Sequence, residues 1–403
     1  MDPIFFHRNP DPATAEGPRQ GLRVALQPNL AVAGWPMEAG SRALAGYAAP
    51  EDATIVRRLR ASGAHLSGST HMSEFGLGLA GNGTGAALRA GEADVELVLD
   101  LMGESRLAAA GAAVCGFKPS YGLVSRFGLV GLIPSMECCG IMSESLGGIR
   151  AVLQVVAGQD GLDFSLPEEP VPDFAPETVD PARITVGVVG EAQHDLGVTQ
   201  EEAFRSAIDG MAGAGFAVRQ VSLPEWPLFA LVHRIVGSVE ASSAAGRYDS
   251  VRYGRRASGA KNWNEMYLLS RGAAFGTLLK SYLIQGAYFQ FERYGAFEDA
   301  CRIRARLVGE MRRLMAEVDV LALPAVVSGP RGGEAADDAS DAPDGVYAQF
   351  ALTLFANVTG QPALCLPSTM ASHTGLQLVG PRLSDGRLLA LAEYLQKTGR
   401  GGN

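Results

Sequence analysis

Hydrophobic and polar positions alternate along this chain in a pattern that predicts strands and helices in turn. The apolar run at residues 22–26, LRVAL, predicts a short buried strand. Residues 86–99 are predicted to be helical, and strands are expected at 183–190 and 217–223 with a helix between them. Residues 226–318 are mostly of helical pattern. Strands that alternate with helices favour a mixed α/β fold.

The pattern predicts one domain over residues 1–403, divided by two polar segments that are rich in acidic residues, one of them also in proline. The expected parts are a core at 20–163, a linker at 164–180, an α/β and helical part at 181–326, a mobile loop at 327–345 and a C-terminal return to the core at 346–396.

Composition narrows the class of protein. A net charge of −9 gives no basic face for nucleic acid or an anionic membrane, and no apolar run is long enough to span a bilayer. The five cysteines are odd in number and lack C-x-x-C spacing, so free thiols in a reducing compartment are expected, without a metal. No signal peptide is recognisable. We expect a cytoplasmic protein that has no cofactor.

The stretch Leu97–Ser125, LVLDLMGESRLAAAGAAVCGFKPSYGLVS, carries Asp100, Glu104 and Arg106 among small and apolar residues. Charged side chains of these types are rarely buried unless they are paired. Three of them within seven positions therefore predict the floor of a site rather than ordinary core.

The same stretch carries a family pattern. Its last ten residues, GFKPSYGLVS, and Asp100, Gly103 and Arg106 match G-[ST]-D-x-G-G-S-[IV]-R-x-P-A followed by G-[LF]-K-P-[ST]-x-G-x-[VL]-S. This resembles the signature of the amidase-signature superfamily. The resemblance extends over residues 20–396, and stretches at 239–256 and 271–289 are most similar to the A subunit of glutamyl-tRNA(Gln) amidotransferase. It implies the amidase-signature fold, a mixed central β-sheet covered by helices on both faces.

The resemblance implies a Ser–cis-Ser–Lys relay, and this chain departs from it at all three positions. Glu104 stands at the nucleophile, Ala80 at the second serine and Gln27 at the lysine. No lysine occurs in residues 1–117, so no shift of register restores the base. Alanine exchanges no proton and glutamine has no useful basicity. We therefore expect that the chain has lost amide hydrolysis.

The neighbours of these positions follow from the same resemblance. Asp100, Ser105 and Arg106 are expected to support the turn. Its backbone N–H groups would form the oxyanion hole at Leu101, Met102 and Gly103. The pocket residues are expected to be Tyr121, Tyr282 and Phe350. At Tyr282 and Phe350 aromatic rings replace the charged groups with which the amidotransferase branch holds its amino acid.

Two interpretations of Glu104 stay open. The carboxylate either pairs with Arg106 or a turn N–H and only holds the loop together, or it acts as a new general acid or base. In the second case burial would raise its pKa into a useful range, with His71 as its partner. His71 alone is more typical of a hydrogen-bonded structural residue. A Ser105 nucleophile, which requires a slip of one residue, is disfavoured because the run to Ser125 has no gap.

Two functional classes follow. The first is a pseudoenzyme, a binding or scaffold subunit with a degenerate triad. The second is a repurposed enzyme of secondary metabolism that performs a cyclisation, elimination or isomerisation through Glu104. Residual amidase activity is the third and weakest hypothesis. We expect a small-molecule ligand and either a protein partner or a homodimer, and neither nucleic acid nor a membrane.

Overall fold

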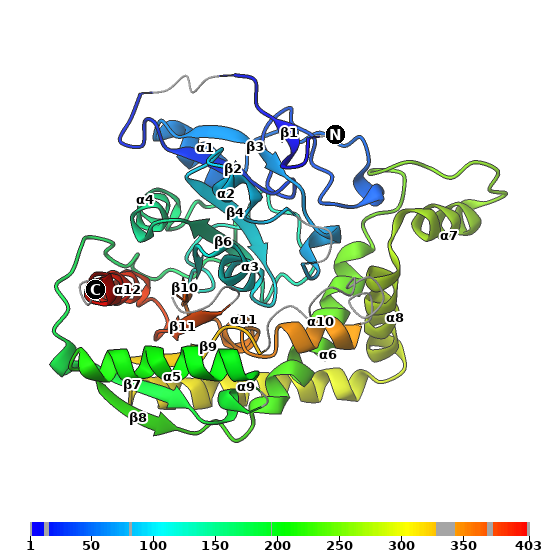
Figure 1. The fold of residues 1–403 in the computed structure, drawn as a ribbon. Coiled ribbons are helices and arrows are strands. Elements are labelled where there is room, and N and C mark those ends of the chain that lie inside the picture. The colour runs from blue at the N-terminus through cyan, green and yellow to red at the C-terminus, as the bar shows by residue number, and fades with distance from the viewer. Residues whose placement is uncertain are drawn as a thin grey trace.

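The computed structural model describes residues 2–11, 16–79, 83–194, 196–327, 343–368 and 374–400. One eleven-stranded sheet runs through the molecule in the order β1-β3-β2-β4-β6-β5-β10-β11-β9-β7-β8 (Figure 1). Its strands are β1 Phe5–Arg8, β2 Arg23–Leu26, β3 His65–Thr70, β4 Val95–Asp100, β5 Cys115–Lys118, β6 Cys138–Ser143, β7 Thr185–Val189, β8 Ala217–Val221, β9 Val320–Pro324, β10 Ala363–Pro367 and β11 Gly375–Val379.

The sheet is mixed. β2 pairs in parallel with β3 and β4, and β7 pairs in parallel with β8 and β9, while the remaining pairs are antiparallel. The C-terminal strands β10 and β11 lie between β5 and β9, so the end of the chain joins the two halves of the sheet. This arrangement confirms the predicted mixed α/β fold.

Helices flank the sheet and pack on it through two large apolar clusters, one with α1, α4, α5 and α12 and the other with α6, α8, α9 and α11. The helices are α1 Thr54–Ala61, α2 Ala86–Arg89, α3 Glu104–Ala112, α4 Leu146–Val156, α5 Val198–Gly213, α6 Trp226–Ala245, α7 Trp263–Ala274, α8 Thr277–Phe291, α9 Tyr294–Met315, α10 Pro343–Gln349, α11 Phe355–Thr359 and α12 Asp385–Arg400. Short 3-10 turns occur at Arg42–Leu44, Glu74–Gly76, Pro181–Arg183 and Glu191–Gln193. Within the described ranges, no helix is long and apolar enough to cross a membrane.

The prediction of a helix over residues 86–99 is wrong. Only α2 is helical there, and β4 follows as an interior strand of the sheet between β2 and β6. All six residues of β4 are buried, so its apolar run lacks the period-two signal of a half-exposed strand and resembles a buried helix in sequence.

The polar loop predicted over 327–345 differs at its C-terminal end. α10 begins at Pro343, a residue type that suits the first turn of a helix, so the last three positions of that segment are helical. Residues 328–342 lie outside the described residues. The division of the chain into a core, a linker and a returning C-terminal part stays a prediction.

Candidate functional site

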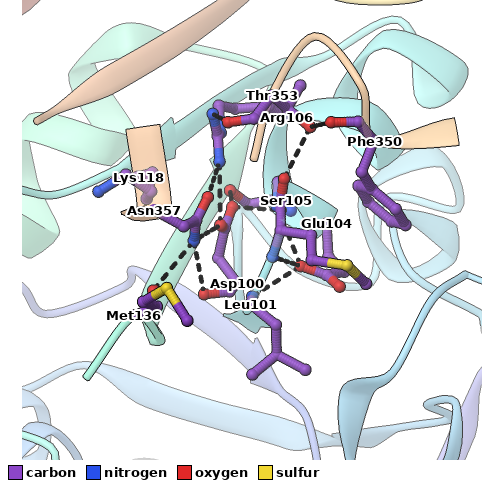
Figure 2. A network of polar contacts seen from close by, with 12 residues as sticks. Asp100, Leu101, Glu104, Ser105, Arg106, Lys118, Met136, Phe350, Thr353 and Asn357 are labelled. Carbon is purple, nitrogen blue, oxygen red and sulfur yellow. Dashed lines mark hydrogen bonds and ion pairs between the residues drawn. The ribbon is translucent and has the colours of Figure 1, made fainter. Parts of the chain in front are cut away.

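The candidate site is the turn that joins β4 to α3, where Asp100 ends the strand and Glu104 begins the helix (Figure 2). Gly103 has a φ of 126°, a backbone conformation that side chains other than hydrogen rarely allow. A Cβ atom at this position would overlap the Thr353 hydroxyl. The sequence therefore needs glycine here for two reasons, its backbone angle and the close approach of Thr353.

Arg106 links the turn to the C-terminal part of the chain through hydrogen bonds. Its side chain is completely buried. One terminal nitrogen donates to Asp100 Oδ1 at 3.1 Å and to Asn357 Oδ1 at 2.6 Å. The other donates to the Thr353 carbonyl and to Gln377 Oε1, each at 2.8 Å. Acceptors from widely separated parts of the sequence are thus fixed around one guanidinium, which sets the geometry of the turn.

Asp100 is the buried anion of this network. Burial alone would raise its pKa, but the charge of Arg106 and hydrogen bonds from the Ser105 hydroxyl and the Asn357 amide overcome that effect and hold the pKa below its usual range. Ser105 also donates its backbone N–H to Asp100 at 3.2 Å. The Ser105 hydroxyl is therefore already engaged by a carboxylate.

The Glu104 side chain folds back onto its own turn. Its Oε2 atom accepts hydrogen bonds from the backbone N–H groups of Leu101 at 2.7 Å, Met102 at 2.8 Å and Gly103 at 3.1 Å (Figure 2). Three N–H donors that converge on one oxygen are the arrangement that stabilises an oxyanion in acyl transfer. Here the oxygen belongs to the protein itself.

The second carboxyl oxygen of Glu104, Oε1, is buried and finds no hydrogen-bond partner among the described residues. Desolvation, together with the negative charge of Asp100, raises the pKa of Glu104 to about 8, although the backbone N–H groups of Met102, Glu104 and Leu101 oppose the shift. Burial therefore favours the protonated, neutral form of this side chain. Of the two structural pairings expected for Glu104, the geometry has the turn N–H groups, while Arg106 pairs with Asp100.

His71 was predicted as a partner of Glu104, and the structure does not bring the two into contact. The His71 ring is hydrogen-bonded through Nε2 to the Asp2 carbonyl at 2.9 Å and packs edge-on against Phe6. In the part of the chain that the structure describes, no hydrogen bond or ion pair links His71 to Glu104. Its environment is that of a structural histidine.

Gln27 lies at the end of β2 beside β4. Its Oε1 atom accepts from the Leu99 N–H at 2.8 Å, and its Nε2 atom donates to the Thr84 hydroxyl at 3.2 Å. The side chain is nearly fully buried. A neutral amide thus links two strands and a neighbouring loop at the predicted lysine position. Ala80, the position of the second serine, lies outside the described residues.

Aromatic and imidazole side chains from three helices close over the turn. His233 of α6 donates from Nε2 to the Leu101 carbonyl at 3.0 Å, since a carbonyl only accepts. Its pKa is lowered to about 4 by burial, so the ring is neutral and Nδ1 accepts from the Tyr347 hydroxyl at 2.8 Å. Tyr347 then accepts from the Tyr282 hydroxyl at 3.0 Å. The result is a directed chain of hydrogen bonds from α8 through α10 to the turn.

Sequence reasoning named Tyr282 and Phe350 but missed His233 and Tyr347. The only signal for His233 is its place, next to Arg234, within the otherwise apolar helical run WPLFALVHRIVG, and such a pattern is typical of many structural histidines. Tyr121 lies apart from this group by its contacts, because its hydroxyl donates to the Pro134 carbonyl at 2.8 Å. Tyr121 is therefore not part of the hydrogen-bonded chain, and the pocket of Tyr121, Tyr282 and Phe350 stays a prediction.

The turn and its cover leave little surface for a substrate. Glu104 is 3% exposed, Tyr282 1% and Phe350 0%. Gly237 on α6 makes room for the Tyr282 hydroxyl, since a Cβ atom there would lie 2.5 Å from that oxygen. Within the described ranges, no group of three or more His, Cys, Asp or Glu side chains is placed to hold a metal ion.

The comparisons with known proteins agree with this fold. The model of the family described as Amidase matches residues 8–84 and 80–389, so the chain belongs to the amidase family. The glutamyl-tRNA(Gln) amidotransferase A subunit of Natronomonas pharaonis is 33% identical over 417 residues, which cover 95% of this chain and 96% of the relative. That of Halobacterium salinarum is 32% identical over 412 residues, which cover 95% and 96%.

Solved structures share the architecture. The crystal structure of the glutamyl-tRNA(Gln) amidotransferase A subunit from Thermotoga maritima superimposes with a TM-score of 0.82 at 22% identity and covers 98% of this chain and 87% of that one. The similarity to this structure concerns the fold alone. Together with the family match, it confirms the predicted amidase-signature fold, and the 33% identity to the Natronomonas pharaonis protein confirms the predicted likeness to the amidotransferase A subunit.

Proposed function

We propose that this chain is an amidase-fold protein without amide hydrolysis, which serves as a binding or scaffold subunit. The observation that carries the proposal is the position of Glu104 Oε2 on the three N–H groups of Leu101, Met102 and Gly103. A substrate carbonyl needs these donors as its oxygen becomes negative. In this chain they are already satisfied by a covalently attached carboxyl group.

The positions of nucleophile and base support the same proposal. A protonated Glu104 is a poor nucleophile, and its neighbour Ser105 is hydrogen-bonded to Asp100. Gln27 uses both ends of its amide in structural hydrogen bonds, and the aliphatic side chain of Ala80 carries no proton to transfer. Loss of one member of such a catalytic unit already removes most of the rate enhancement.

The relatives supply the binding part of the proposal. They are named as subunits, so a chain that shares their fold over nearly its whole length is proposed to contact a partner protein as well. The buried, aromatic cover of the turn also argues for stability of the fold over substrate access.

Ammonia release tests the loss of hydrolysis. We expect the purified protein, supplied with L-glutamine, L-asparagine or benzamide, to release no more ammonia than its Glu104→Gln variant. The Natronomonas pharaonis relative, assembled with its own partner proteins, serves as the positive control. Hydrolysis that the Ser105→Ala variant abolishes would instead establish Ser105 as a nucleophile and overturn the proposal.

A second candidate function rests on the unpartnered Oε1 atom of Glu104, which has no hydrogen-bond partner among the described residues. A neutral carboxylic acid with one free oxygen is able to donate a proton to a small, apolar ligand in a cyclisation, elimination or isomerisation. For this candidate, Glu104→Gln abolishes turnover while the protein stays folded and ligand affinity changes little. Full turnover in that variant excludes it.

A further inference from the structure

We propose that the outward face of α8 binds an acidic, amphipathic α-helix of a partner protein. This inference rests on the proposed binding role and names the partner's chemistry. It comes from a region that the turn at Asp100–Arg106 does not involve.

An apolar stripe runs along the outer side of α8. Ile284, Tyr288 and Phe291 are spaced by four and three residues, so their side chains share one face of the helix. They are 70%, 47% and 75% exposed. Tyr294, three residues after Phe291 at the start of α9, is also exposed. Single exposed apolar residues are ordinary on a protein surface, but a continuous row of this kind marks an interaction site.

The opposite side of α8 is buried and packs against the rest of the protein. Tyr282, Leu283 and Gly286 are buried, and a Cβ atom at Gly286 would overlap the backbone carbonyl of Ser238 on α6. The close packing of α8 on α6 fixes the direction in which Ile284 and Phe291 point, and that direction is away from the core. In Figure 1, α8 lies at the right-hand edge of the molecule below the projecting α7.

The outer face carries no acidic group. Thr277 and Ser281 continue the same face toward the N-terminus, and Lys280, four residues before Ile284, adds one positive charge to it. Fifteen residues of α-helix extend for about 22 Å, which is long enough to accommodate three to four turns of a partner helix. Anchors at i, i+4 and i+7 are the spacing with which one amphipathic helix recognises another apolar surface.

The charge of the surrounding segment indicates what that partner carries. Residues 247–294 contain eight Lys and Arg against three Asp and Glu, a net charge of +5 in a chain whose total is −9. Arg293 is at the edge of the stripe, where its Nε donates to the Tyr288 hydroxyl at 3.1 Å. Acidic residues beside the partner's apolar face would therefore complement the net positive charge of this segment.

The same charge argues against a second copy of this chain as the occupant. A two-fold dimer through α8 would place each basic segment against its own copy, because both copies use the same patch in such an interface. Like charges across an interface oppose association. A heterologous partner with acidic flanks has no such penalty.

Site-specific photo-crosslinking in the native host tests the proposal. The full-length protein carries p-benzoylphenylalanine in place of Ile284, and a control carries it in place of Val198, which is 72% exposed at the start of α5. After irradiation, the crosslinked peptide is sequenced. We expect a helical, acidic segment of another protein from position 284 and none from position 198.

Every other outcome overturns the proposal. A peptide of this same chain indicates a homodimer, crosslinked RNA indicates a nucleic-acid surface, and a basic or non-helical segment excludes the stated chemistry. Absence of any crosslink at position 284 excludes a partner on this face.

Affinity for the crosslinked segment, made as a synthetic peptide, then identifies the anchors. Ile284→Ser and Phe291→Ser are each expected to weaken binding at least about tenfold, as large apolar anchors of interfaces do. Val198→Ser is expected to leave it unchanged. Equal affinity in all three variants contradicts the assignment of the stripe.

This test is separate from that of the proposed function. Ammonia release by the wild-type protein would refute the loss of hydrolysis and leave the α8 surface intact. A missing crosslink would refute the surface and leave the loss of hydrolysis intact.

Discussion

The turn at Asp100–Arg106 and the outer face of α8 depart from ordinary burial in opposite directions. The turn buries three ionisable side chains, and all of their polar atoms except Glu104 Oε1 and Arg106 Nε find hydrogen-bond partners among the described residues. The α8 face exposes Ile284 and Phe291 without a partner in the described chain. A buried polar network is closed to new ligands, whereas an exposed apolar row is open to them. The turn that corresponds to an enzyme site and the surface that we propose to bind a partner are therefore two different regions of this chain.

Among the predictions for the buried turn, removal of Arg106 has the largest expected effect on stability. Arg106→Ala leaves the Asp100 carboxylate buried without its ion pair, a change that lowers the free energy of unfolding by about 3–5 kcal/mol. Urea denaturation measures it. The matched control is Arg302→Ala, which removes an exposed pair with Asp299 and is expected to lose less than about 1 kcal/mol.

A methyl group at Gly103 tests the turn itself. Gly103→Ala forces an L-residue into a φ of 126° and against the Thr353 hydroxyl, so we expect a loss of about 2–3 kcal/mol in unfolding free energy. Gly91→Ala is the control, because Gly91 also has a positive φ of 66° but open space around its Cβ. A loss equal to that of the control would mean that the contact with Thr353 is unimportant.

Replacement of Glu104 tests the buried turn through the pH dependence of the unfolding free energy. The pKa of Glu104 is raised to about 8 in the folded protein, so the native state holds a proton that the unfolded chain releases. This contribution to stability is complete below the ordinary pKa of a glutamate and is lost as the pH rises through about 8. Glu104→Gln imitates the protonated form, so its stability does not fall in this way as the pH rises.

We therefore expect wild type and Glu104→Gln to have similar unfolding free energies near pH 5. Near pH 9 the variant is more stable by more than about 1.4 kcal/mol, the free energy of one pKa unit. Glu96, whose pKa burial raises to about 7, is present in both proteins, so its effect cancels in the difference. Parallel stability curves would contradict the assigned protonation.

The smallest expected effect on stability is that of a change on the outer face of α8. Ile284→Ser changes an exposed side chain, so the unfolding free energy moves by less than about 0.5 kcal/mol. Thermal unfolding of the isolated protein measures it. A large loss would show that Ile284 supports the fold of this chain and is not held ready for a partner.

The sequence allowed the turn to be located but not its cover. Asp100, Glu104 and Arg106 are close together in sequence, so their shared environment could be predicted from one stretch of the chain. Tyr347 reaches the turn through His233, more than a hundred residues away, and this contact depends on how α6 and α10 pack. Patterns along the chain carry no such information.

The strand β4 illustrates the other limit. Its interior place in the sheet buries both faces, which removes the alternation that identifies a strand. Glu96 is a polar residue in that run, yet it is buried too, since the Thr70 hydroxyl and the Gly85 N–H donate to its carboxylate. The fold class survives such a local error because it depends on the order of many elements.

The central claim is that the Glu104 carboxyl group occupies the N–H groups on which an oxyanion would bind. The most direct measurement follows the backbone amide ¹H and ¹⁵N chemical shifts of Leu101, Met102 and Gly103 from about pH 5 to about pH 9. We predict that all three shifts move together with a midpoint near the Glu104 pKa of about 8, and that Glu104→Gln removes the transition. Amide shifts that do not titrate in this range, or that titrate unchanged in the variant, would contradict the account.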